Sequence, residues 1–213
     1  GAEVAWPIGI GAGYTNHPDI EVVARRVEEA AGIGVGFLTI GSWKLGEPHG
    51  GNGHAQQPDG SWLHTGGDEY HDPSRGLGYN AKGLPGPGIE QGLTRLGDLL
   101  ELTKTRNVRT GLSLSPHSSD PLQEVPELLI AAHTALGIGV DYIELNLSCP
   151  NIPGRPAFYK DGDSVRTFLE VVKNLRHGTL RNKLGERALY LKFGPMDTSV
   201  EDEQLRRTTI SYR

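Results

Sequence analysis

Short apolar runs that suit β-strands alternate along this chain with longer runs that have the periodicity of α-helices. The predicted strands cover residues 7–13, 36–40, 108–115, 142–148 and 188–194. The predicted helices cover residues 19–31, 90–105, 121–136 and 164–175, and a further one begins at 200. Strict alternation of strand and helix indicates a parallel α/β architecture, which folds either as an open doubly wound sheet or as a (β/α)8 barrel.

The predicted strands help to choose between these two architectures, because three of them are apolar on one side and polar on the other. Ile143 and Leu145 alternate with Glu144 and Asn146, and the third and fifth predicted strands alternate in the same way. A sheet covered by helices on both faces would have nearly continuous apolar strands instead. We therefore predict a (β/α)8 TIM barrel. About five of the eight units are expected in this chain, since such barrels have roughly 250 residues.

The chain is predicted to form a single partial barrel domain over residues 1–213. A segment at about 41–87 interrupts the alternation and is rich in Gly, His, Pro and Asp. It is too polar to belong to the core, so we predict a long polar loop inserted into the barrel. Its histidines match no zinc-ligand spacing, and we expect no metal site.

Composition and charge exclude several classes of protein. The chain of 213 residues is long enough for a sizeable core, and its formal net charge of -5 without a Lys/Arg cluster argues against nucleic-acid binding. No apolar run is long enough for a membrane span, and the opening GAEVAWPIGI lacks the basic region of a signal peptide. A single cysteine permits no internal disulfide, which favours a cytoplasmic location.

Several side chains capable of chemistry fall at the carboxyl ends of the predicted strands. In a barrel, Ser113, Asn146, Cys149 and Lys192 would meet at the mouth where such folds place active sites. Asparagine both donates and accepts hydrogen bonds, which suits a planar polar heterocycle, and lysine adds positive charge. Cysteine can act as a base or a nucleophile, although Cys149 taken alone also fits a small buried apolar residue.

Two glycine-rich loops have the flexibility to approach a flat ligand. GIGAGYTNHP at 9–18 departs from the dinucleotide-binding pattern G-x-G-x-x-G at Tyr14. Residues 11–13 would still let a ligand lie close to the backbone, and a purely structural turn explains them equally well. GLPGPG at 83–88 is the second loop.

ELNLSCPNIPGRP at 144–156 resembles the motif of dihydroorotate dehydrogenases, which are FMN-dependent enzymes of pyrimidine biosynthesis. Further similarities follow in the family's order: PIGIGAG at 7–13, GFLTIGS at 36–42, NAKGLPGPGIE at 80–90 and LYLKFGP at 189–195. The chain thus looks like a member of this family, whose fold is a (β/α)8 barrel with FMN over its mouth.

The resemblance implies roles for the residues that match the family's motifs. Cys149 would be the general base that takes a proton from C5 of dihydroorotate, while a hydride passes from C6 to FMN. Lys192 would lie by the N1–O2 edge of the flavin and stabilise the reduced ring. Residues expected to bind the substrate are Asn80, Gly83, Leu84, Asn146 and Asn151. Residues expected to line FMN are Ala12, Gly13, Gly41, Ser42, Ser113, Asn146 and Lys192.

Features of two classes of this family occur together. Cysteine at position 149 is similar to the soluble class 1 enzymes, whereas TIGSWKLGEPHGGNG is closer to the membrane-associated class 2. Both classes hold the substrate carboxylate with a lysine, but this chain has Ile40 at the class 1 position and Asn16 at the class 2 position. Lys44 or Lys82 would have to substitute. An FMN dehydrogenase acting on another small cyclic substrate is therefore an alternative function.

The family holds the FMN phosphate on loops that follow its last strands, so we expect residues 1–213 alone to bind FMN poorly or not at all. A non-catalytic barrel remnant is accordingly a second alternative. The residues do not select among fumarate, NAD through a partner subunit, and quinone as the electron acceptor. The expected partner is a small-molecule substrate, and barrels of this kind often form homodimers.

Overall fold

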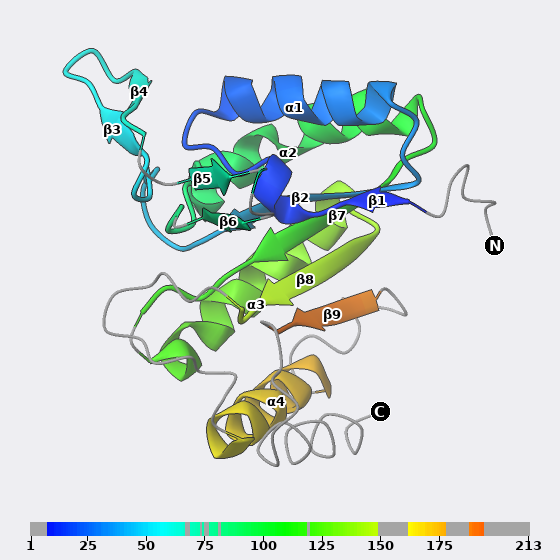
Figure 1. The fold of residues 1–213 in the computed structure, drawn as a ribbon. Coiled ribbons are helices and arrows are strands. Elements are labelled where there is room, and N and C mark those ends of the chain that lie inside the picture. Colours follow the sequence, from blue (N-terminus) through cyan, green and yellow to red (C-terminus); the bar gives the residue numbers. More distant parts are fainter. Residues whose placement is uncertain are drawn as a thin grey trace.

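A single sheet of parallel strands organises the protein (Figure 1). The computed structural model describes residues 8–66, 69–72, 74, 77–80, 82–118, 120–148, 162–177 and 188–193. The order across the sheet is β1-β2-β7-β8-β9, and every neighbouring pair is parallel. These strands are β1 (Gly9–Ile10), β2 (Phe37–Trp43), β7 (Arg109–Leu114), β8 (Tyr142–Asn146) and β9 (Ala188–Lys192). The predicted parallel α/β architecture is confirmed.

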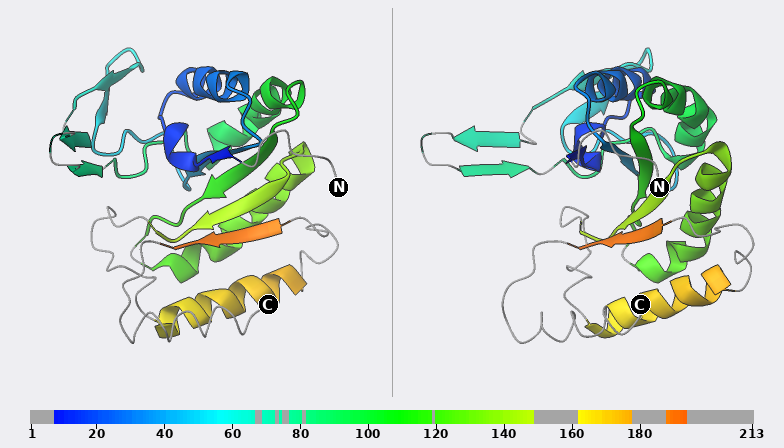
Figure 2. Two further views of the ribbon diagram at one scale, coloured as in Figure 1. Left: turned by 45° about the vertical axis from the view of Figure 1, so that its right-hand side comes forward. Right: turned by 90° about the vertical axis from the view of Figure 1, so that its right-hand side faces the viewer.

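Four α-helices connect consecutive strands of this sheet and follow one another around its outer side (Figure 2). They are α1 (Ile20–Gly32), α2 (Ile89–Lys104), α3 (Pro121–Ile138) and α4 (Gly162–His177). Each was predicted from its periodicity, within a few residues at either end. The helix expected from residue 200 lies outside the described residues.

Local capping explains where two of the helices begin. Asp19 precedes α1 and accepts a hydrogen bond from the backbone N–H of Glu21 at 2.9 Å. Asp120 precedes α3 and accepts from the N–H of Leu122 at 3.1 Å, and Pro121 occupies the first helical turn. A capping carboxylate satisfies a free N–H of the first turn and interacts favourably with the helix dipole.

The hydrophobic core lies between the helices and the outer face of the sheet. Side chains on this face are completely or almost completely buried, namely Leu38, Ile40, Leu112, Leu114, Ile143 and Leu145. They join apolar residues of the helices in one cluster, including Val23, Val27, Leu96, Leu99, Leu128 and Ala132. Full burial of each large aliphatic side chain contributes about 1.5–3 kcal/mol. The core thus fixes which face of each strand is left for polar residues.

The prediction of one polar loop over 41–87 is wrong at its start. Gly41, Ser42 and Trp43 continue β2, and Trp43 is 0% exposed within the core. The pairing of β2 with β7 is irregular between Gly41 and Trp43, so Ser42 is an extra residue in the strand. Simple alternation would have sent Ser42 to the apolar side and Trp43 to the polar side, but this β-bulge reverses both.

The remainder of this segment contains two antiparallel hairpins and a glycine-rich connection to α2. The first hairpin pairs β3 (His54–Gln56) with β4 (Trp62–His64), and the second pairs β5 (Glu69–Asp72) with β6 (Leu77–Asn80). Both hairpins lie beyond the carboxyl ends of the sheet strands (Figure 1). Residues 84–88 are buried, so this part of the segment also departs from the predicted surface loop.

Candidate active site

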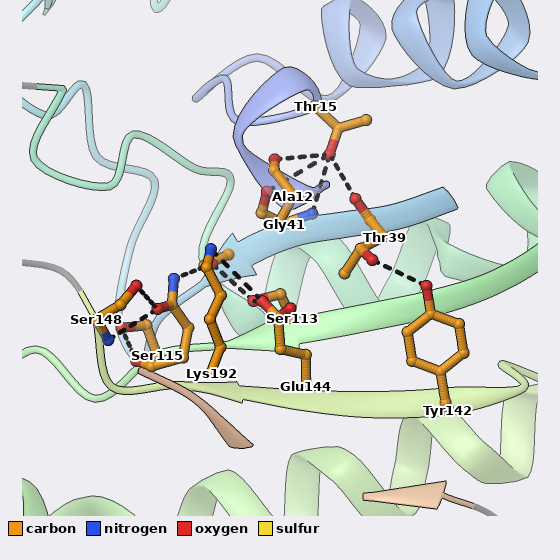
Figure 3. Close-up of polar contacts among 12 residues, drawn as sticks. Ala12, Thr15, Thr39, Gly41, Ser113, Ser115, Tyr142, Glu144, Ser148 and Lys192 are labelled. Carbon is orange, nitrogen blue, oxygen red and sulfur yellow. Dashed lines mark hydrogen bonds and ion pairs between the residues drawn. The ribbon is translucent and has the colours of Figure 1, made fainter. Parts of the chain in front are cut away.

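The inner face of the sheet carries a row of polar side chains from four adjacent strands (Figure 3). Ser113 of β7 is paired with Glu144 of β8, and Asn146 is paired with Lys192 of β9. Gly41 of β2 is paired with Ser113 on the other side. The predicted meeting of Ser113, Asn146 and Lys192 near the carboxyl ends of the strands therefore agrees with the observed register.

Three buried side chains in this row form a continuous chain of hydrogen bonds. The Asn146 amide Nδ2 donates to Ser42 Oγ at 2.8 Å, and Ser42 Oγ lies 2.7 Å from Ser113 Oγ. Ser113 Oγ donates to Glu144 Oε1 at 2.7 Å. The chain spans β2, β7 and β8, so it couples the ends of three strands.

Lys192 stands at the end of this chain, beside Glu144. Its Nζ lies 3.8 Å from Glu144 Oε1, and its side chain is 42% exposed whereas that of Glu144 is 18% exposed. An ion pair this open to water contributes little to stability, about 0–1 kcal/mol. The exposed ammonium can instead supply positive charge to a bound group.

Asn146 is the best anchored of the predicted site residues. It is 4% exposed, and its Oδ1 accepts from the backbone N–H of Ser148 at 3.0 Å and from Ser148 Oγ at 2.6 Å. Its backbone carbonyl accepts from Ser115 Oγ at 2.9 Å. These contacts fix the orientation of the Asn146 amide and the direction in which the polypeptide leaves β8.

The first glycine loop is tied to the end of β2 by one hydroxyl group. It forms a short 3₁₀ helix, η1 (Ala12–Tyr14), and Thr15 Oγ1 lies 3.2 Å from the carbonyl oxygen of Ala12 and 3.4 Å from that of Gly41. Thr15 Oγ1 also accepts from the N–H of Gly41 at 3.1 Å. Ala12, Gly13, Gly41 and Ser42 are thereby brought to the same edge, and their role in lining FMN stays a prediction.

The second glycine loop passes the same edge. Gly86 lies against Ser42, since a Cβ built on Gly86 would be 3.5 Å from the Ser42 carbonyl oxygen. Leu84 is buried with a positive φ of 56°, and Gly83 packs against Asn52. No interaction found among the described residues joins Gly83 or Leu84 to the polar row itself.

Three predicted substrate residues cannot be placed in this geometry. Cys149 and Asn151 lie outside the described residues, and so does the side chain of Asn80, whose backbone ends β6. The nearest described residue to Cys149 in sequence is Ser148, held by Asn146. Their proposed roles remain predictions.

Sequence reasoning gave no role to four residues that shape the row: Thr15, Ser115, Tyr142 and Glu144. Tyr142 Oη lies 2.8 Å from Thr39 Oγ1 and its ring meets the ring of Tyr190 edge-on at 5.5 Å, which closes the row on the side away from the carboxyl ends of the strands. Burial raises the pKa of Tyr142, and its hydrogen bond with Thr39 opposes that rise. The signal that could have found Tyr142 and Glu144 is their position on the same strand face as Asn146.

Buried residues occupy the two positions at which the resemblance implies a lysine. Ile40 belongs to the core on the outer face of the sheet, and Asn16 is 8% exposed with no hydrogen-bond partner for its Oδ1. Lys44 is buried directly after β2. The pKa of His49 is lowered first by the burial of its own ring, then by the charge of Lys44 and then by His117. Lys44 and the two histidines thus lie near one another beside the end of β2.

Within the described part of the chain, no three His, Cys, Asp or Glu side chains are grouped as metal ligands. The same part contains no helix long and apolar enough to span a membrane. The arrangement is that of an α/β protein with a polar site at the carboxyl ends of parallel strands, suited to bind a flat polar molecule next to a lysine.

Comparison with known proteins identifies the family of this chain. The dihydroorotate dehydrogenase family model matches residues 70–210. A dihydroorotate dehydrogenase (quinone) from Roseiflexus castenholzii is 25% identical over 97% of this chain and 49% of its own length. A dihydroorotate dehydrogenase (fumarate) from Trypanosoma cruzi is 36% identical over 44% of this chain and 28% of its own length.

The chain belongs to the dihydroorotate dehydrogenase family, as its sequence motifs predicted. It spans about half the length of the curated relatives that it matches along nearly its whole length. Relatives named for quinone and for fumarate both match it, which parallels the mixture of class features in its sequence.

Proposed function

We propose that this protein takes part in the FMN-dependent oxidation of dihydroorotate to orotate in pyrimidine biosynthesis. The observation that carries the proposal is the buried hydrogen-bond chain from Asn146 through Ser42 and Ser113 to Glu144, with Lys192 beside it. Buried polar groups are costly unless hydrogen bonds satisfy them, and these are satisfied by one another. They lie at the carboxyl ends of the strands, where (β/α)8 barrels bind their substrates.

The described residues fit a flat ring system such as that of FMN. Gly13 has open space where a Cβ would project, so a planar group can lie against its backbone. The half-exposed Lys192 ammonium offers positive charge to an electron-rich ring edge. When bound, FMN supplies the acceptor for the substrate's hydride. Ala12, Gly41, Ser42, Ser113 and Asn146 are proposed to complete the lining.

The proposed chemistry of the protein's own residues is proton removal and charge stabilisation. Cys149 is proposed to take the proton from C5 of dihydroorotate, because it follows directly after the anchored Asn146–Ser148 turn. Lys192 is proposed to stabilise negative charge that develops beside it. Asn80, Gly83, Leu84, Asn146 and Asn151 are proposed to position the substrate.

We also propose that residues 1–213 form one domain with the geometry of a (β/α)8 barrel, in which the two hairpins are an insertion between β2 and α2. Support comes from the helices on the outer side of the sheet and from the polar inner face. An open doubly wound sheet would carry helices on both faces.

A related flavin dehydrogenase with a different small cyclic substrate is the second candidate. The observation that favours it is that Ile40 and Asn16 leave both family lysine positions without a cation. A substrate without a carboxylate would need no such lysine. Asn16, with its unpaired buried oxygen, would instead suit a hydrogen-bond donor of the substrate.

Dihydroorotate turnover with a dye acceptor tests the proposal, because the names of the relatives point to different natural acceptors. With FMN added in excess, we expect the protein to bind the flavin and to reduce the dye only when dihydroorotate is added. Cys149→Ala should lower kcat by about 10²–10⁴-fold while the flavin band is retained, since a general base contributes that much. Glu28→Gln on the exposed face of α1 serves as the control.

The outcomes separate the candidates. Flavin binding without any oxidation of dihydroorotate would favour the related dehydrogenase. Absence of both flavin and turnover would favour a non-catalytic barrel. Unchanged kcat in Cys149→Ala would remove the proposed base while leaving the family assignment intact.

A further inference from the structure

Glu144 is a carboxylate within the candidate site to which the proposed reaction gives no role. It lies on the inner face of β8 between Ser113 and Lys192, and its Oε1 contacts both. Its side chain is largely shielded from water at 18% exposure. A carboxylate in such a place disfavours a second negative charge nearby. Lys192 is proposed to stabilise a negative charge, so the presence of Glu144 beside it requires an explanation.

The hydrogen-bond chain has a fixed direction as long as Glu144 is ionised. A carboxylate only accepts, so the single hydroxyl proton of Ser113 is committed to Glu144 Oε1 at 2.7 Å. Ser113 Oγ must then accept from Ser42, whose own proton is thereby used. Ser42 Oγ is left to accept from Asn146 Nδ2 at 2.8 Å.

Contacts with Ser148 and Ser42 together decide what Asn146 presents to a ligand. Its Oδ1 is occupied by the N–H and the hydroxyl of Ser148, and one of its two amide hydrogens is occupied by Ser42. The remaining hydrogen makes Asn146 a donor to the site. Because amide and hydroxyl groups in such a chain polarise one another, the charge on Glu144 is felt at Asn146.

We propose that Glu144 is a positioning residue, which holds Lys192 as its counter-ion at the site and sets the direction of the Ser113 and Ser42 hydroxyls, so that Ser42 accepts from the Asn146 amide that Ser148 holds in place. The part that concerns flavin chemistry rests on the proposed function. In that setting Glu144 neutralises Lys192 in the resting site, and any negative charge that forms beside Lys192 competes with Glu144 for the ammonium. Glu144 thereby limits how strongly the site stabilises an anion.

The orientation of the chain is testable in the protein without flavin. The probe is the side-chain NH₂ resonance of Asn146 in ¹⁵N-labelled protein, assigned by its loss in Asn146→Asp. Glu144→Gln preserves the shape and removes the charge, and it should shift this resonance, whereas Glu28→Gln should not. Ser113→Ala interrupts the chain, so the effect of Glu144→Gln in that background should fall to less than half.

The counter-ion role is testable in flavin-loaded protein with inorganic sulfite, an anion that binds oxidised flavins more tightly when positive charge lies nearby. Glu144→Gln should lower the sulfite dissociation constant about three- to tenfold, because an ion pair this exposed is worth only about 1 kcal/mol. The midpoint potential of the flavin should become more positive in the same variant. Lys192→Met should move both quantities in the opposite direction.

These results distinguish the failure of this proposal from that of the proposed function. If no variant retains flavin, the proposed function fails and the Asn146 resonance still decides whether Glu144 orients the chain. An Asn146 resonance that is unchanged in Glu144→Gln overturns the orienting role. An unchanged sulfite dissociation constant and midpoint potential in flavin-loaded Glu144→Gln overturn the counter-ion role.

Discussion

At the scale of single residues, Gly111 shows how tightly the inner face of the sheet is packed. A Cβ built on Gly111 would overlap the ring of Tyr142 on the neighbouring strand. That ring is held in place by the hydroxyl contact with Thr39 at 2.8 Å. The absence of a side chain at position 111 therefore makes room for the residue that closes one side of the candidate site.

We predict that Gly111→Ala lowers the free energy of unfolding by about 2–3 kcal/mol, because the new methyl group displaces the Tyr142 ring from its partner. Urea denaturation followed by circular dichroism measures the change. In a Tyr142→Ala background the same substitution should cost less than about 1 kcal/mol, since the clash is gone. An equal cost in both backgrounds would show that the ring is not the cause.

Residue types and strand periodicity were enough to predict Ser113, Asn146 and Lys192 at one edge of the sheet, and their register confirms it. The same periodicity placed Glu144 on the polar face without giving it a partner. Whether that carboxylate meets a lysine or water depends on which strand lies beside β8. Residues 144 and 192 are far apart in the sequence, so no local pattern contains this information.

At the scale of secondary-structure elements, the contact between α2 and the end of β2 decides where the core stops. Trp43 is fully buried, and a Cβ on Gly92 would lie 2.6 Å from its ring. The helix can approach the indole only because position 92 has no side chain. On the same helix, the nearest atom to a Cβ on Gly97 would be 4.0 Å away, on Ile138.

These two glycines form a matched pair for a stability measurement. We predict that Gly92→Ala destabilises the protein by about 1–3 kcal/mol, because overpacking against Trp43 outweighs the gain in helix propensity. Gly97→Ala should stabilise it by about 0.5–1 kcal/mol, because there only the propensity gain remains. Thermal or urea unfolding of both variants checks the signs, and a stabilising Gly92→Ala would contradict the packing argument.

Element positions were predicted well from the sequence, whereas the end of β2 was not. Helical periodicity and capping residues such as Asp19 and Asp120 are local, so they appear in the sequence directly. The extension of β2 through Trp43 depends on a β-bulge at Ser42 and on the approach of α2 at Gly92. Both are tertiary features, and a glycine-rich polar segment gave no sign of them.

At the scale of the whole molecule, the packing of His17 makes stability depend on pH. His17 is buried, and burial first, then His54 and Arg26, lower its pKa from 6.5 to about 4. Its Nδ1 accepts from the N–H of Asp19 at 3.0 Å, and its ring meets that of His54 edge-on at 4.6 Å. Through these contacts the β3–β4 hairpin packs against the first loop.

The sign of this effect follows from proton binding. Between about pH 6.5 and pH 4 the unfolded chain binds a proton at His17 that the folded protein does not, so folding loses stability as the pH falls through this window. The loss is about 3 kcal/mol, since a pKa difference of one corresponds to about 1.4 kcal/mol. The lowered pKa of His49 acts in the same direction.

We expect urea midpoints to fall between pH 7 and pH 4, and His17→Asn, which keeps a hydrogen-bond acceptor, to remove much of that dependence. Gln91→Asn on the exposed side of α2 changes no titratable group, so as the control it should leave the slope unchanged. A slope that is identical in His17→Asn and in the unmodified protein would show that His17 is not responsible.

The sequence by itself determined the alternation of strands and helices, the polar and apolar faces of the strands, and the family. These depend on periodicities of two and 3.6 residues and on contiguous motifs, which are local properties of the chain. The tertiary structure decided which polar residues bond to one another. Strand order and register bring Glu144 to Ser113 and Lys192, and the bulge turns Ser42 toward Asn146. Such contacts join residues of different strands, so they exist only once the sheet and the core behind it have formed.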